Sequence, residues 1–262
     1  MADFSSVRAI YFDLDDTLCG YWDASKKGLR KAFGEHGPEG LDVEEMVREW
    51  SAAFREFAPS LKRTGWYEGY LQSGEATRTE SMRLALMRMG VDEPERARKL
   101  SEAYLQHRHY ALSLFPEARE VLNSLRGRYP LGLITNGPAD IQRMEIEGLG
   151  IGTYFDNVFI EGELGFGKPK PEVFERAAAA VSCSPDELLF VGNSYAHDIA
   201  PALAAGWFAA WVRRPSDVPP SSGPEKTEPE EKPEGGADPH MVINNLRQLL
   251  PLLGRTPINE AR

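Results

Sequence analysis

The chain has 262 residues and a formal net charge of -10. This charge argues against partners that present a phosphate backbone or an anionic membrane, because the overall field would repel them. Its two cysteines, Cys19 and Cys183, are too few and too far apart for a disulfide framework or a cysteine metal site, which favours a reducing compartment. Residues 1–8 lack the basic start of a secretory signal, and no later run is apolar enough to span a bilayer. We therefore expect a cytoplasmic protein with no nucleic-acid polymer or membrane as its partner.

Short apolar runs that end in polar or small residues recur along the chain. They lie at Val7–Phe12, Leu131–Ile134, Val158–Ile160, Leu188–Val191 and Phe208–Val212. Such runs are typical of strands that are buried on both faces of a parallel sheet. Helical patterns separate the later runs, so the sequence predicts an α/β fold with a doubly wound parallel sheet, whose ligands bind beyond the carboxyl ends of the strands.

The helical patterns fall into two groups. Asp140–Leu149 and Glu172–Val181 lie between the later strands, and Pro171 precedes the second at a position suited to a first helical turn. Residues 20–110 form the other group, with four amphipathic patterns and no convincing strand. These patterns are Asp23–Phe33, Val43–Phe57, Thr79–Met89 and Glu95–Tyr110.

A crossover between two parallel strands does not need so much chain. We therefore expect residues 20–110, called the insert below, to be an inserted helical domain, and residues 1–19 and 111–262 to form the core. Residues 213–240 are rich in Pro, Glu, Ser and Gly and should form a flexible loop, because they can bury little apolar surface. A short strand at Met241–Ile243 and a helix at Leu246–Leu253 are expected after it.

The strongest local signal is the hexapeptide DLDDTL at residues 13–18, directly after the first apolar run. Asp13 and Asp15 can point into one crevice and share a divalent cation. The alternative is an acidic turn in which Asp16 or Thr17 caps the next helix.

Three later segments also follow apolar runs or open helices. Thr135, Asn136 and Gly137 could hold phosphoryl oxygens, although such a triplet is often just a turn. Lys168, in a loop bounded by glycine and proline, could place an ammonium beside a phosphate, or could simply be solvated. Asp198 is either a metal-site carboxylate or a first-turn residue favoured by the helix dipole. We assign the neighbouring His197 to structure or solvent.

Taken together and in this order, these segments resemble the four signature motifs of the haloacid dehalogenase-like hydrolases. The resemblance covers nearly the whole chain apart from residues 213–240, and the insert resembles the family's helical cap domain. The stretch from Phe115 to the Lys168 loop looks most similar to pyrimidine 5'-nucleotidases and N-acylneuraminate-9-phosphate phosphatases.

The resemblance implies a magnesium-dependent phosphohydrolase that acts on a small phosphorylated metabolite, such as a nucleoside monophosphate or a sugar phosphate. By this resemblance Asp13 is the nucleophile and Asp15 is the general acid and base. Thr135 and the backbone of Asn136 hold phosphoryl oxygens, while Lys168 screens the nucleophile from the phosphate.

The same resemblance assigns the Mg²⁺ ligands to Asp13, the backbone carbonyl of Asp15, Asp198 and water. The chain departs from the family pattern at Asn193, where aspartate is common. We expect Asn193 to join the metal site as a neutral ligand that weakens metal binding without abolishing catalysis.

Several aromatic or basic residues of the insert could contact a substrate, although aromatics at helical spacing more often form a core. They are Tyr21, Trp22, Arg55, Trp66, Tyr67 and Tyr70.

Two other functions remain open from the sequence. A 2-haloacid dehalogenase has the same fold, but carbon–halogen displacement needs no proton donor such as Asp15. A catalytically silent binding protein would not need the retained acids and lysine. Transfer of the phosphoryl group to a sugar hydroxyl is a further variant of the proposed chemistry, and the oligomeric state is expected to be a monomer or a homodimer.

Overall fold

The computed structural model describes residues 3–220 and 229–253 of the chain. Its centre is a six-stranded sheet in the order β3-β2-β1-β4-β5-β6, in which every pair of neighbours is parallel. The predicted doubly wound α/β fold is confirmed. The strands are β1 (Ala9–Phe12), β2 (Leu131–Thr135), β3 (Asn157–Ile160), β4 (Leu188–Gly192), β5 (Phe208–Val212) and β6 (Met241–Ile243).

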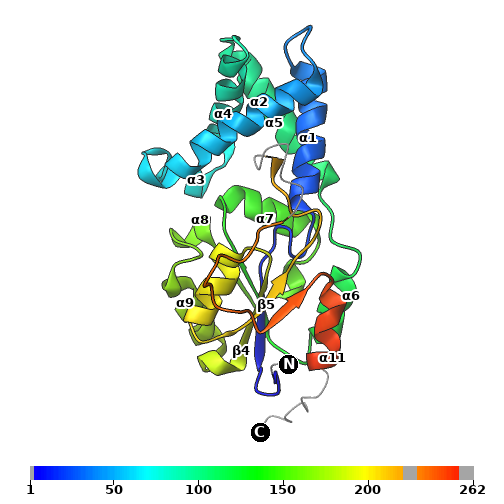
Figure 1. The fold of residues 1–262 in the computed structure, drawn as a ribbon, viewed down its shortest axis with the longest axis vertical. Helices are drawn as coiled ribbons and strands as arrows, with labels where there is room; N and C mark the ends of the chain where they lie inside the picture. Colours follow the sequence, from blue (N-terminus) through cyan, green and yellow to red (C-terminus); the bar gives the residue numbers. More distant parts are fainter. Residues whose placement is uncertain (1–2, 221–228, 254–262) are drawn as a thin grey trace.

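Helices cover both faces of this sheet (Figure 1). The helices of the core are α6 (Ala118–Leu125), α7 (Ala139–Gly148), α8 (Glu161–Leu164), α9 (Pro171–Val181), α10 (Ala200–Ala204) and α11 (Leu250–Leu253), with short turns η2 (Gly152–Tyr154), η3 (Pro185–Glu187), η4 (Tyr195–Ile199) and η6 (Leu246–Leu249). Ile10 and Phe12 of β1 pack with α6, α7 and α11, whereas Ala9 and Tyr11 pack with α9 and α10. Because neither face of β1 meets water, all of its residues are apolar and buried.

A glycine in β2 makes room for the largest side chain of β1. A Cβ at Gly132 would lie 2.0 Å from Cε1 of Tyr11, so no other residue fits there without moving the ring. The hydroxyl of Tyr11 donates to the carbonyl of Ala177 in α9 at 2.8 Å. The ring therefore ties the centre of the sheet to the helix that covers it.

The insert has its own apolar core, built from side chains such as Phe33, Trp50 and Leu100. The helices of the insert are α1 (Tyr21–His36), α2 (Val43–Phe57), η1 (Ala58–Arg63), α3 (Trp66–Gln72), α4 (Glu75–Arg88) and α5 (Pro94–Ala111). Gly28 allows α1 to approach α5 closely, because a Cβ there would lie 2.9 Å from the backbone nitrogen of Arg108. Asp42 caps α2 by accepting hydrogen bonds from two backbone N–H groups.

The four helices predicted in the insert are present, with ends shifted by a few residues. Three helices were not predicted, α3 in the insert and α6 and the four-residue α8 in the core. The helix expected at Leu246–Leu253 is divided into η6 and α11. Within the described ranges no helix is long and apolar enough to cross a membrane.

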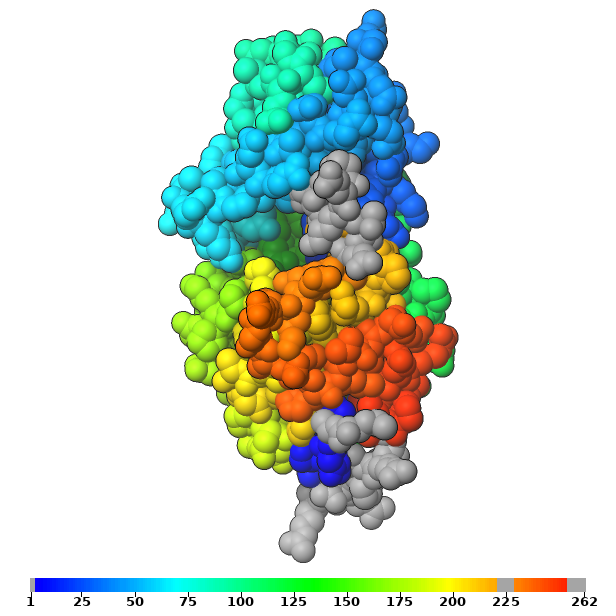
Figure 2. Space-filling model, in the orientation of Figure 1, coloured from blue at the N-terminus to red at the C-terminus, as the bar shows by residue number. Residues whose placement is uncertain are grey.

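The insert lies beyond the carboxyl ends of the strands (Figure 1). A cleft with a volume of about 920 Å³ separates it from the core, and Figure 2 shows the molecule hollowed there, between the cyan helices and the yellow and orange core. The cleft therefore occupies the place where the sequence predicts ligand binding.

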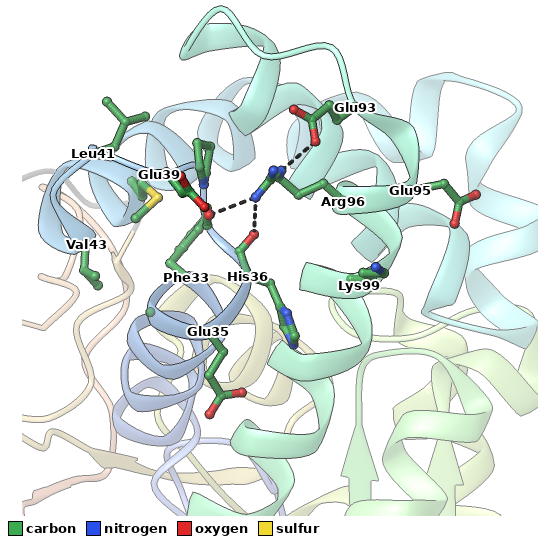
Figure 3. Close-up of a pocket in the computed structure, with 14 residues that line it drawn as sticks. Phe33, Glu35, His36, Glu39, Leu41, Val43, Glu93, Glu95, Arg96 and Lys99 are labelled. Atoms are coloured by element: carbon green, nitrogen blue, oxygen red, sulfur yellow. Dashed lines mark hydrogen bonds and ion pairs between the residues drawn. The ribbon is translucent and has the colours of Figure 1, made fainter.

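A second hollow, of about 490 Å³, lies at the far end of the insert, where α1 ends against α5 (Figure 3). Arg96 donates to the carbonyls of His36 and Gly37 and also pairs with Glu93. The guanidinium thus satisfies carbonyl groups at the end of α1 that have no partner within the helix. Arg96, which lines this hollow, therefore has a structural role at the end of α1.

Candidate active site

The polar residues of the cleft come from neighbouring strand ends. Asp13 follows β1, Thr135 ends β2 and Asn193 follows β4, and these three strands are adjacent in the sheet. Parallel strands end at the same edge, so their side chains converge. All the residues predicted for the site line this one cleft, namely Asp13, Asp15, Thr135, Asn136, Lys168, Asn193 and Asp198.

Lys168 lies between two carboxylates. Its Nζ is 2.6 Å from Oδ1 of Asp13 and 2.6 Å from Oδ1 of Asp198, and only 2% of its side chain is exposed. Burial lowers the pKa of Lys168, but the two carboxylates outweigh burial and raise it, so the ammonium stays charged. Asn136 fixes the loop of Lys168 through both ends of its side-chain amide, which accepts from the backbone N–H of Lys168 and donates to its carbonyl.

Asp13 is held in place on its second oxygen as well. Its Oδ2 accepts a hydrogen bond from the hydroxyl of Thr17 at 3.0 Å. Burial and the nearby Asp198 raise the pKa of Asp13 to about 6, although Lys168 and Thr17 act to lower it. A carboxylate that burial destabilises in this way keeps more of its nucleophilic character than a solvated one.

The carboxylate of Asp198 packs closely against the backbone at the end of β4. A Cβ at Gly192 would lie 2.4 Å from Oδ2 of Asp198, and the same oxygen accepts from the backbone N–H of Ser194 at 2.9 Å. Glycine at this position therefore allows the carboxylate to reach Lys168. His197, which we assigned to structure or solvent, contacts the Ser194 hydroxyl in the same turn.

Asp15 belongs to a hydrogen-bonded chain that sequence reasoning missed. Gln142 of α7 accepts from the Thr135 hydroxyl at 2.6 Å and donates to Asp15 and to Glu145, each at 3.2 Å. Burial, followed by the negative charges of Glu145 and Asp13, raises the pKa of Asp15 well above its usual value. The carboxyl of Asp15 therefore keeps a proton at a pH where a solvated aspartate has lost it.

The insert is connected to this series of hydrogen bonds through one buried ion pair. Arg108, at the end of α5, contacts Glu145 of α7 at 2.8 Å, and both side chains are almost fully buried. Arg108 also donates to the hydroxyl of Tyr21. Burial raises the pKa of Glu145, and Arg108 counteracts this. The pair links the insert to the helix that carries Gln142.

Residues 213–240 contribute two further acidic groups that were not predicted. Asp217 accepts a hydrogen bond from Nδ2 of Asn193 at 2.9 Å, and Glu230 accepts from Ser194 and from the backbone N–H of Tyr195. Asp217 is 7% exposed, and burial raises its pKa to about 6. The described parts of this segment contain no strand, but these contacts differ from the expectation of a loop that buries little.

The Asn193 amide is oriented by its two neighbours. Its Nδ2 faces Asp217, while its Oδ1 lies 3.2 Å from the hydroxyl of Thr17, on the side of Asp13. The amide oxygen is therefore turned toward the carboxylates of the site.

The donor groups of the site suit a hard divalent cation. The carboxylates in contact with Lys168 or Asn193 are Asp13, Asp198 and Asp217, whose three negative charges exceed the one positive charge of Lys168 by two. In the described parts of the chain, no three Asp, Glu, His or Cys side chains converge closely enough to hold an ion alone. The oxygen of Asn193, a backbone carbonyl and water would have to complete the set. Asp16 adds a buried Oδ2 without a hydrogen-bond partner in the described structure.

Several of the insert residues singled out in the sequence line the cleft. Tyr21, Trp22, Tyr67 and Tyr70 do so, and Tyr67 donates to Glu161 of the core at 2.7 Å. None of these side chains is fully buried, so the expectation that they form the core of the insert is wrong. Two others do not reach the cleft lining, namely Arg55 and Trp66.

An acidic crevice at the carboxyl edge of a parallel sheet defines the class: an α/β enzyme whose chemistry runs through carboxylates. A family model described as haloacid dehalogenase-like hydrolase matches residues 7–206, and one described as HAD-hydrolase-like matches residues 165–249. The chain belongs to the haloacid dehalogenase-like hydrolase family, as the sequence motifs predict.

Three curated relatives span nearly the whole chain. A phosphoserine phosphatase from Thermus thermophilus is 34% identical, over 93% of this chain and 98% of that protein. The pyrimidine 5'-nucleotidase YjjG from Escherichia coli is 31% identical, over 93% and 96%. An N-acylneuraminate-9-phosphatase from Rattus norvegicus is 26% identical, over 95% and 94%. The predicted enzyme class, a phosphoric monoester hydrolase, is confirmed at this level.

Two solved structures share the fold. The HAD-hydrolase YfnB from Bacillus subtilis, described as bound to magnesium, superposes with a TM-score of 0.69 at 20% identity and covers 94% of this chain and 98% of its own. A 2-haloacid dehalogenase from Pseudomonas syringae superposes with a TM-score of 0.61 at 29% identity and covers 95% and 99%. At 20% identity, the similarity to the YfnB structure shows a shared fold alone.

Proposed function

We propose that this enzyme hydrolyses small phosphate monoesters, such as a nucleoside monophosphate or a sugar phosphate, through a phosphorylated Asp13. The observation that carries the proposal is the pairing of two unlike aspartates in one cleft. Asp13 contacts the ammonium of Lys168, whereas burial and the charges of Glu145 and Asp13 raise the pKa of Asp15 well above its usual value. Two carboxylates with such different environments are suited to the separate roles of nucleophile and acid.

In the first step a carboxylate oxygen of Asp13 forms a bond to phosphorus, and the bond from phosphorus to the leaving oxygen breaks. Asp15 gives its proton to that oxygen. In the second step water attacks phosphorus, Asp15 takes a proton from the water, and the bond to Asp13 breaks. Inorganic phosphate leaves, and both aspartates return to their starting states.

Other residues of the chain position these two groups. Lys168 neutralises part of the charge that would otherwise repel an approaching phosphate, and Asn136 fixes the loop that carries it. Gln142 sets the distance between Thr135 and Asp15. The Thr135 hydroxyl must turn from Gln142 toward the phosphate to donate to it.

The proposed cofactor is Mg²⁺, held by Asp13, Asp198, Asn193, the backbone carbonyl of Asp15 and water. When bound, such an ion neutralises phosphoryl charge and polarises the phosphorus for attack. We also propose that the insert acts as a cap that excludes water and contacts the leaving group. The buried pair of Arg108 and Glu145 supports this role, because it joins the insert to the helix beside Asp15.

A burst experiment with p-nitrophenyl phosphate tests the mechanism. Its leaving group needs little help from an acid, so Asp15→Asn should release about one equivalent of p-nitrophenolate per enzyme and then stall as the phosphoenzyme, because no base activates water. Asp13→Asn should give neither burst nor turnover. Steady turnover by Asp15→Asn at the parent rate would contradict the assignment of Asp15.

The similarity to a 2-haloacid dehalogenase structure makes dehalogenation a second function to test. A dehalogenase would release chloride from 2-chloropropionate in the presence of EDTA, whereas the proposed phosphatase would not. The raised pKa of Asp15 favours the phosphatase, because a protonated acid serves an oxygen leaving group and has no use in halide release. The absence of any metal-dependent phosphate release from the parent protein would instead favour a silent binding protein.

A further inference from the structure

Four Lys and Arg side chains line the cleft in the described part of the chain: Lys62, Arg78, Arg108 and Lys168. Three of them are paired with carboxylates. Lys62 contacts Glu161, Arg108 contacts Glu145, and Lys168 contacts Asp13 and Asp198. The fourth, Arg78 of α4, has no ion pair within residues 3–220 and 229–253.

Arg78 is held in position but keeps most of its donors free. Its Nε donates to the hydroxyl of the buried Ser101 at 3.1 Å, which is the one hydrogen bond that the described structure gives to its guanidinium. A guanidinium has five N–H donors, so four have no protein acceptor among the described residues. A planar fork with unused donors suits a carboxylate or phosphate group.

The side chain of Arg78 also lies close to the strand-end loop of the core. A Cβ at Gly74 would lie 3.3 Å from Nη1 of Arg78 and 3.3 Å from Cγ of Pro138, so the guanidinium and the loop after Thr135 border the same small space. The absence of a side chain at Gly74 leaves room for the arginine at this point.

A leaving group would pass this arginine. Asp15 acts on the leaving oxygen in the proposed mechanism, and the insert lines the same cleft with three cationic groups, Lys62, Arg78 and Arg108. Glu161 of the core pairs with Lys62. The charge of Arg108 is already balanced by Glu145. Burial and the neighbouring Arg108 lower the pKa of Arg78, while Tyr104, Asp140 and Glu75 act to raise it, and an arginine remains charged at neutral pH.

We propose that Arg78 binds a carboxylate on the leaving group, so that the preferred substrates are short phosphate monoesters that carry a carboxylate. The inference rests on the proposed phosphatase function and narrows its substrate class. No carboxylate contacts Arg78 in the described structure, although Asp140 and Glu75 act on its charge from a greater distance. One such guanidinium matches one negative charge, which favours a carboxylate over a second phosphate in a cleft that is already rich in acidic groups.

A matched pair of substrates tests the proposal. sn-Glycerol 3-phosphate and 3-phosphoglycerate differ in a hydroxymethyl group that is replaced by a carboxylate. The parent enzyme should have a higher kcat/KM for 3-phosphoglycerate. Arg78→Gln should lower that value by about 10- to 100-fold, as expected for a lost charge-assisted contact, and should change kcat/KM for glycerol 3-phosphate and p-nitrophenyl phosphate by no more than about twofold.

Arg83→Gln is the matched control, because Arg83 lies on the same helix, pairs with Glu80 and does not line the cleft. It should leave all three substrates unchanged. An equal loss on all three substrates with Arg78→Gln would overturn the proposal and assign Arg78 to the transferred phosphoryl group or to structure. A parent preference for fructose 1,6-bisphosphate over 3-phosphoglycerate would overturn it in favour of a second phosphate.

The two proposals fail in different ways. If the parent hydrolyses none of these esters, including p-nitrophenyl phosphate, the phosphatase proposal fails. If it hydrolyses p-nitrophenyl phosphate but does not prefer the carboxylated ester, only the role of Arg78 fails. Glycerate should also inhibit the parent enzyme competitively. This inhibition should be lost in Arg78→Gln and kept in Arg83→Gln, which would support carboxylate binding by Arg78 without reference to turnover of the carboxylated ester.

Discussion

Replacing Asp217 by asparagine should weaken magnesium binding although this residue lies outside the ligand set proposed from the sequence. Asp217 accepts the hydrogen bond that turns the oxygen of Asn193 toward Asp13, at 2.9 Å from Nδ2. With Asp15 protonated, Asp217 also supplies one of the three negative charges that Lys168 and a divalent cation together balance. Its loss leaves an excess of -1 for the cation to neutralise.

The expected magnitude follows from both effects. Partners that orient a metal ligand change metal affinity by about 10- to 100-fold when they are replaced. The side-chain carbonyl of the introduced asparagine can still accept from Asn193, so the orientation survives in part and the lost charge dominates. We therefore expect a Kd for Mg²⁺ about tenfold higher in Asp217→Asn than in the parent protein.

Isothermal titration of the protein with MgCl₂ measures this affinity without reference to activity. Asp238→Asn is the control, because Asp238 belongs to the same segment, is 86% exposed and pairs with Lys232 on the surface. It removes the same charge and should leave the Kd unchanged. Equal affinity in the Asp217 variant and the parent would refute the reasoning, and an equal loss in both variants would show only the effect of net charge.

Three further results are expected. Asn193→Asp should bind Mg²⁺ more tightly but unfold at a lower Tm in EDTA, because two carboxylates then face each other where an amide now donates to Asp217; equal or poorer metal affinity would defeat the idea. Glu117→Gln should cost about 3 kcal/mol at pH 7 in urea unfolding, because it breaks the buried pair with Arg214. Burial raises the pKa of Glu117, but the hydrogen bond and charge of Arg214 outweigh burial and lower this pKa below 4.5. The stability that the pair contributes is therefore present above pH 4.5 and should disappear as the pH falls further. A stability difference between variant and parent that stays constant from pH 7 to pH 3 would contradict this role of the ion pair. Gly132→Ala should destabilise the protein by about 3 kcal/mol, because its Cβ would overlap a buried tyrosine ring, and an unchanged Tm would contradict this packing.

The sequence could predict those parts of the site that lie at strand ends. Buried strands have an apolar pattern that stops abruptly, and the residues after each stop must lie at one edge of a parallel sheet. Asp13 and Thr135 were found in this way, Asn193 was added through the resemblance to the family pattern, and the structure places all three in one cleft. Lys168 was found because glycine and proline flank it in a loop.

The site residues that sequence reasoning missed have no local sequence pattern that indicates a role in the site. Gln142 and Glu145 occupy polar positions of an amphipathic helix, where such residues usually face water. Only the arrival of Arg108 from the insert and of Asp15 from the end of β1 gives them a function. Asp217 lies in a segment whose composition predicts disorder, and nothing in its neighbours indicates a hydrogen bond to Asn193.

Two of the three missed helices were missed for different reasons. α3 has seven residues, too few for a periodic pattern to stand out. α6 does have a clear pattern, with Val121, Leu122 and Leu125 buried on one side, and it could have been predicted. Its eight residues span little more than two turns, which makes the pattern less conspicuous than that of the longer helices.

The insert and the segment at residues 213–240 bring charges of opposite sign to the same cleft at the edge of the sheet. The strand ends gather acidic groups that alone would repel a phosphate ester, and Lys168 is already engaged by two of them. The segment adds Asp217, which increases the demand for a cation, while the insert brings Arg108 and Arg78 to the opposite wall. An anionic ester entering the cleft would thus meet a cation at the core and an unpaired guanidinium at the insert. In the proposed mechanism, a core without the insert would keep Asp13 and Asp15 but would lack Arg78, the group proposed to bind the leaving group.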